Sequence, residues 1–86
     1  MENKVLIKLV MFDKDECFDI FIPANEIIWK IKKLIINSIS DIKNQNINPN
    51  DEYLLINKDT AKIYDNNEIV INTDIRNGTE LIMFKK

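Results

Sequence analysis

Residues 17–31 read CFDIFIPANEIIWKI, and within this stretch the spacing of apolar side chains changes from every second residue to every third or fourth. Pro23 ends the first pattern, and we expect the side-chain oxygen of Asn25 to cap a helix that starts there. The first pattern is typical of a strand with one buried face, to which the chain contributes Phe18, Ile20 and Ile22. A strand that passes directly into an amphipathic helix is therefore expected.

The expected helix carries its apolar residues along one stripe. Spacings of three and four residues place them on one face, while most lysines and polar residues fall elsewhere. We therefore expect one main helix of about 16 residues, the only convincing helix in the sequence. Its stripe consists of Ile27, Ile28, Ile31, Leu34, Ile35, Ser38, Ile39 and Ile42.

Strands are expected on both sides of this helix. Large apolar and β-branched residues form runs too short for independent helices, and turn-forming residues separate them. The first two strands should form a hairpin, and Gly78 should turn the chain into the last strand after a short apolar segment at 68–71. The expected strands are residues 5–12, 17–22, 53–56, 61–64 and 79–86.

This order of elements predicts the class of fold. A hairpin, one helix and further strands indicate an α+β protein in which a mixed sheet of four or five strands packs on one main helix, the β-grasp arrangement. Because 86 residues suffice for one core, we expect a single domain over residues 1–86.

Composition excludes several classes of protein. Lysines interrupt the apolar runs well short of the roughly 20 residues that span a bilayer, so no direct membrane insertion is expected. A net charge of −2 gives no general attraction for nucleic acid. One cysteine and no secretion signal favour a cytoplasmic protein, and abundant Ile, Asn and Lys suggest an AT-rich bacterium.

Catalytic and metal-binding chemistry has little support in the sequence. The chain has no histidine, and the acidic neighbours of Cys17 disfavour a reactive thiolate, so we expect no enzyme activity and no cofactor. Residues 13–16 resemble the start of a calcium loop, but the turn glycine and the distant glutamate are missing, so no metal site is expected. The lysines at 30, 32 and 33 form either a solvated face or a docking site for an acidic protein surface.

A surplus of apolar residues is left outside the expected core. If the odd residues of 5–11 face the helix, the even ones face outward, and in the last strand Leu81 and Met83 close the core while their neighbours face outward. Steps of about 100° per residue place two helix residues on a flank away from the stripe. The candidate protein-binding surface therefore comprises Leu6, Val10, Phe12, Phe21, Trp29, Ile36, Ile82 and Phe84. Alternatively, loops and long neighbouring side chains cover these groups; a homodimer formed through them is a further hypothesis.

Two segments, together with the order of elements, resemble the YukD/EsaB family of small ubiquitin-like proteins. Residues 18–23 read FDIFIP and match its segment before the helix, and residues 75–84 read IRNGTELIMF and match its turn with a glycine before an apolar strand. The resemblance covers nearly the whole chain except the Asn-rich residues 43–50. It implies a ubiquitin fold, in which the first strand lies beside the last, so we expect the outward apolar residues of these strands to form one patch. It also implies an accessory or regulatory role in bacterial type VII secretion, with a component of that machinery or its regulators as partner. The alternative is a generic β-grasp adaptor or a self-associating domain unrelated to secretion.

Ubiquitin-like modifiers end in Gly-Gly, because an unhindered terminal carboxylate must enter the activating enzyme. Here the last strand ends in Lys85 and Lys86, and the sequence holds a single glycine. We therefore expect non-covalent binding rather than conjugation or sulfur transfer.

Overall fold

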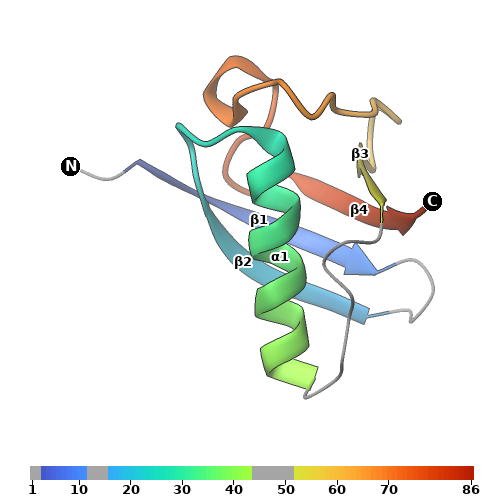
Figure 1. Cartoon of the computed structure of the whole chain (residues 1–86). Coiled ribbons are helices and arrows are strands. Elements are labelled where there is room, and N and C mark those ends of the chain that lie inside the picture. Colours follow the sequence, from blue (N-terminus) through green and yellow to red (C-terminus); the bar gives the residue numbers. More distant parts are fainter. Residues whose placement is uncertain (1–2, 12–15, 44–51) are drawn as a thin grey trace.

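A single helix lies across one face of a four-stranded sheet in the computed structural model, which describes residues 3–11, 16–43 and 52–86 (Figure 1). This confirms the expected α+β class with a mixed sheet and one main helix. The elements are β1 (Lys4–Met11), β2 (Glu16–Pro23), α1 (Ile28–Lys43), β3 (Tyr53–Asn57), the 3₁₀ helix η1 (Val70–Asn72) and β4 (Glu80–Lys85).

The strands are arranged in the order β2-β1-β4-β3, so the first and last strands lie side by side at the centre. β1 pairs with β2 antiparallel and with β4 parallel, and β3 pairs with β4 antiparallel. Both the expected hairpin and the expected neighbourhood of the first and last strands are confirmed. The sheet therefore presents one face to α1 and leaves the opposite face, here called the outer face, without a helix (Figure 1).

The core lies between α1 and the sheet. Leu81 and Met83 of β4 are buried there, as the alternation of the last strand predicts. Every second residue of the other strands joins them, because side chains of a strand alternate between its two faces. The helix and the other strands contribute Ile7, Leu9, Met11, Ile20, Ile22, Ile28, Ile31, Ile35, Ile36, Ile39 and Leu55 to this core.

The helix begins at Ile28, later than the expected cap at Asn25. Its first N–H groups donate to main-chain carbonyls of a distant segment: Ile28 to Glu68 at 2.8 Å and Trp29 to Asn66 at 3.2 Å. These carbonyls satisfy donors that a side-chain cap otherwise would. The prediction of an Asn25 cap was therefore wrong, and a tertiary contact sets this end of the helix.

The chain between β3 and β4 forms less sheet than expected. Residues 61–64 make one bridge, between Ile63 and Ile56, and Ala61 has a φ of 61°. Further along, the segment expected to be short and apolar makes a bridge at Ile69 and the turn of η1. Gly78 has a φ of 89° and turns the chain into β4, as predicted.

Within the described part of the chain, no helix has the length and apolar character needed to cross a membrane.

Candidate protein-interaction surfaces

An apolar row crosses the outer face of the sheet. Val10 lies in register with Cys17 on one side and with Ile82 on the other. Ile82 pairs in turn with Ile56, which bridges to Ile63. All five side chains are half-buried or exposed, because they alternate with residues that face the core. We call this set the outer apolar row, and the pair Leu54 and Phe84 lies next to it.

A row of alternating charges runs beside the outer apolar row. Lys8 pairs with Asp19 of β2 and with Glu80 of β4. Lys58 reaches the same Glu80 with its Nζ 3.0 Å from Oε2, a hydrogen bond that raises the pKa of Lys58 and lowers the pKa of Glu80. Opposite charges in neighbouring positions stabilise the pairing of strands. This row, here called the charged row, crosses β2, β1 and β4 and ends at Lys58, the residue after β3.

The charged row divides the surface that the sequence suggested would be continuous. Leu6 and Phe21 form a cross-strand pair on one side of it, and Val10, Ile82 and Phe84 lie on the other. The expectation of a single apolar patch was therefore wrong, because a row of charged side chains separates two smaller patches.

The predicted surface residues have different positions. Phe21, Trp29 and Phe84 are exposed, and Leu6, Val10 and Ile82 are half-buried; Phe12 lies outside the described residues. Ile36 is only 3% exposed, so its predicted exposure was wrong. Its flank of α1 faces the segment after β3, whose Tyr64 belongs to the same core. Sequence reasoning also missed Leu54, Ile56 and Ile63, although alternation within 53–57 was a usable signal.

A groove lies between α1 and the edge of the sheet formed by β3. It has a volume of about 490 Å³ and is closed by the segment 63–66 and by the end of β4. Trp29 and Ile36 line it from the helix, and Tyr53 and Leu54 line it from β3. The groove therefore places the exposed helix tryptophan beside aromatic and aliphatic residues from two other segments, β3 and residues 63–64.

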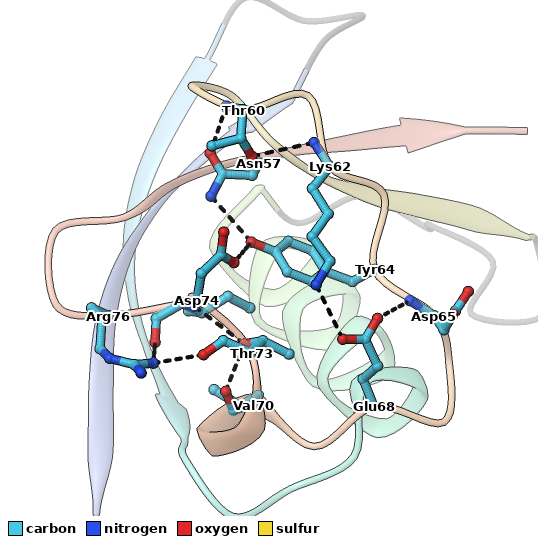
Figure 2. A network of polar contacts seen from close by, with 11 residues as sticks. Asn57, Thr60, Lys62, Tyr64, Asp65, Glu68, Val70, Thr73, Asp74 and Arg76 are labelled. Atoms are coloured by element: carbon cyan, nitrogen blue, oxygen red, sulfur yellow. Dashed lines mark hydrogen bonds and ion pairs between the residues drawn. The ribbon is translucent and has the colours of Figure 1, made fainter.

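Tyr64 lines this groove, and two hydrogen bonds hold its hydroxyl in place (Figure 2). The hydroxyl of Tyr64 donates to Asp74 Oδ1 at 2.5 Å and accepts a hydrogen bond from Asn57 Nδ2 at 3.1 Å. Tyr64 is 2% exposed, and burial together with the Asp74 contact raises its pKa to about 12. These bonds tie the segment after β3 to the turn before β4.

Further polar contacts hold the same region (Figure 2). Thr73 donates its hydroxyl to the Val70 carbonyl at 2.6 Å, and Arg76 Nη1 donates to the Thr73 carbonyl at 2.8 Å. Glu68 pairs with Lys62 at 3.3 Å. Among the described residues, no three acidic or thiol side chains form a group that could hold a metal ion. Of residues 13–16, which resemble the start of a calcium loop, only Glu16 lies within the described residues.

We expect Tyr64→Phe to lower the free energy of unfolding by about 1–2 kcal/mol, because Asn57 and Asp74 lose a buried partner. A tyrosine whose folded pKa is raised contributes stability that is fully present below pH 10 and is lost as pH rises toward 12. Urea denaturation between pH 8 and about 12 should therefore show a smaller difference between wild type and variant at high pH. A difference that stays constant over this range would contradict the raised pKa of Tyr64.

Known structures share this fold. No family model and no curated protein matches the sequence. A chain of the MycP5-free ESX-5 inner membrane complex has a TM-score of 0.77 and 11% identity, and the match covers 96% of this protein but only 21% of that chain. The N-terminal ubiquitin-like domain of the 4931431F19Rik protein has a TM-score of 0.70 and 17% identity over 100% of this protein and 78% of that chain. Ubiquitin from Caldiarchaeum subterraneum has a TM-score of 0.68 and 12% identity, and the match covers 98% of this protein and 95% of that chain.

These similarities define the class of the molecule. With its mixed four-stranded sheet and single helix, the protein has a ubiquitin-like β-grasp fold.

Proposed function

We propose that the protein is a non-catalytic, cytoplasmic accessory or regulatory component of a type VII secretion system that acts through non-covalent protein binding. Two observations support the secretion setting. The segments FDIFIP and IRNGTELIMF resemble the YukD/EsaB family, and part of a chain in the ESX-5 inner membrane complex has a similar fold. The proposed link to secretion rests on these two similarities, and the proposed non-covalent binding rests on the outer apolar row.

The outer apolar row is the observation that carries the binding role. It crosses the whole sheet and ends at Ile63, whose side chain is exposed, with Phe84 exposed beside it. Contiguous apolar surface on a small protein usually marks an interaction site, and an aromatic residue at the centre of an interface contributes strongly to affinity. A partner that covers this row would remove several apolar side chains from water at once.

The charged row can set the orientation in which a partner binds to this surface. Asp19, Lys8 and Glu80 present alternating charges along one border of the apolar row. Charges at the border of an interface contribute more to orientation and rate of association than to affinity. A partner with the complementary pattern would dock in one orientation.

Affinity capture from lysate of the source organism tests this function. We expect wild-type protein to retain a component of the secretion machinery, and Phe84→Ser or Ile63→Ser to lose it. Phe21→Ser is the matched control, because Phe21 is exposed on the other side of the charged row. Each variant is first checked for a wild-type unfolding transition.

Deletion of the gene provides the second readout. We expect effector export to change under inducing conditions. Unchanged export, together with capture of partners unrelated to secretion, would instead favour a generic β-grasp adaptor. Capture of only its own copies would favour a self-associating domain, for which sedimentation at increasing protein concentration is the direct measurement.

A further inference from the structure

We propose that the groove between α1 and β3 binds an acidic segment of a partner protein that inserts one apolar side chain. This site shares Ile63 with the outer apolar row but opens between α1 and β3. It rests on the proposed function only in that the protein binds other proteins. The inference follows from the shape of the groove, its charges and the position of Trp29.

The shape suits a side chain that enters from a partner. Ile36 and Tyr64 line the groove yet are almost fully buried, so they form its floor. Trp29, 40% exposed, lines it from the helix, and the exposed Ile63 lines it from the segment after β3. A volume of about 490 Å³ lies within the range of ligand pockets. The hydrogen bonds of Tyr64 hold the floor in place before any ligand arrives.

The charge of the groove is locally positive although the whole protein carries −2. Lys32, Lys33 and Lys86 line it, against the carboxylates of Glu52 and Asp65. Glu52 is already paired with Lys86 at 3.5 Å, and both side chains are largely exposed. An anionic ligand would therefore face a local excess of cationic groups.

Two of these lysines are poorly compensated. Lys32 donates to the neutral Asn66 Oδ1 at 2.6 Å. Burial and repulsion from Lys86 lower the pKa of Lys32 and outweigh the attraction of Glu52. Lys33 Nζ lies 5.0 Å from the centre of the Trp29 ring, and no carboxylate among the described residues pairs with it. A carboxylate from a ligand would supply the missing counter-charge at both positions.

The size of the groove, its exposed tryptophan and its few lysines favour a short acidic peptide over a nucleic acid. A nucleic acid strand is an extended polyanion that depends on a broad basic surface. The groove instead presents three lysines, and the carboxylates of Glu52 and Asp65 stand among them. A peptide needs only one or two carboxylates near Lys32 and Lys33 and one aliphatic or aromatic side chain beside Trp29, the anchor-and-charge arrangement common at protein interfaces.

The experiment uses a capped synthetic peptide of sequence Glu-Glu-Leu-Phe-Glu-Glu. Trp29 is the only tryptophan, so its fluorescence reports occupancy of the groove directly. Amide shifts of the labelled protein map the site independently. We expect saturable binding at millimolar peptide or below, with shifts concentrated at α1, β3 and residues 63–66.

Two control peptides test the proposed chemistry. A peptide with serines in place of Leu-Phe and one with lysines in place of the glutamates should both bind much more weakly. Equal binding of the serine peptide would show attraction by charge alone and would overturn the proposal. No binding of the acidic peptide, or shifts spread over both faces of the protein, would overturn it as well.

A matched pair of lysine variants tests whether the acidic peptide binds at the groove. Lys33→Gln should weaken binding by about threefold to fivefold, the effect of losing one exposed ion pair. Lys4→Gln makes the same change in net charge at the start of β1, away from the groove, and should leave binding unchanged. Equal weakening by both variants would reject the groove as the site. These measurements use purified protein, so they stand or fall independently of the link to secretion.

Discussion

Leu81→Ala is expected to lower the free energy of unfolding by about 3–4 kcal/mol, a large share of the roughly 5–15 kcal/mol that stabilises a small domain. Leu81 is 0% exposed and belongs to β4, which lies between β1 and β3. Removal of its side chain leaves a cavity between Leu9 on the neighbouring strand and the helix above, because the paired backbones cannot close around the gap. Urea denaturation followed by circular dichroism measures the change. If the native state is intact, the dependence of the free energy of unfolding on urea concentration should keep its wild-type slope.

Ile82→Ala is the matched control for this prediction. Ile82 is the next residue in the same strand, has a side chain of the same size and faces the outer side of the sheet, where it is half-buried. We expect a loss of about 1 kcal/mol or less, since less apolar surface returns to water and no closed cavity forms. Similar losses from the two variants would mean that the two faces of β4 are not distinct.

The alternation behind this pair of variants could be predicted from the sequence because it is local. Side chains of a strand alternate between its faces wherever the strand lies, so the inward position of Leu81 and Met83 followed from the pattern alone. The helical stripe and the hairpin of β1 with β2 were predictable for the same reason. Gly78 marked its turn because few other residues adopt its φ of 89°.

Features that depend on contacts between distant segments could not be predicted. The start of α1 is set by carbonyls of Asn66 and Glu68, about 40 positions further along the chain. Ile36 is buried in the core that also contains Tyr64, a residue of the segment after β3. Periodicity gives the direction of a side chain on its helix, but it does not show which other segment will cover that side.

In the candidate surfaces too, local features could be predicted from the sequence and contacts between distant segments could not. The sequence identified outward-facing apolar residues such as Val10 and Ile82, but only strand register reveals that Lys8 stands between Asp19 and Glu80 and separates two patches. The groove was inaccessible to sequence reasoning, because it joins four segments whose relative placement the pattern does not contain.

Asn57→Ala is expected to lower the free energy of unfolding by about 2–3 kcal/mol, the second large effect. The Asn57 side chain, in a residue 5% exposed, makes three hydrogen bonds. Its Oδ1 accepts the N–H groups of Asp59 at 2.9 Å and Thr60 at 3.2 Å, and its Nδ2 donates to the Tyr64 hydroxyl at 3.1 Å (Figure 2). Alanine leaves the two turn N–H groups and the tyrosine oxygen without this partner, at about 1 kcal/mol for each lost bond. Urea denaturation at pH 7 measures the loss.

Asn57→Asp separates the role of the oxygen from that of the amide group. The carboxylate keeps the acceptor for Asp59 and Thr60, but it brings a second oxygen against the Tyr64 hydroxyl, whose hydrogen is already donated to Asp74. The two N–H bonds favour the charged carboxylate, whereas burial and the contact with the Tyr64 oxygen favour the neutral acid. We expect burial and the contact to prevail and to raise the pKa of the introduced carboxyl above its unfolded value of about 3.9. A group with a raised folded pKa contributes stability that is fully present below the unfolded pKa and is lost as pH rises through the folded pKa. We therefore expect the variant to approach wild-type stability near pH 4, where the carboxyl donates as the amide did, and to fall about 2 kcal/mol below it at pH 7. Asn57→Ala should show no such recovery, and an equal deficit of Asn57→Asp at both pH values would refute the donor role of the Asn57 amide.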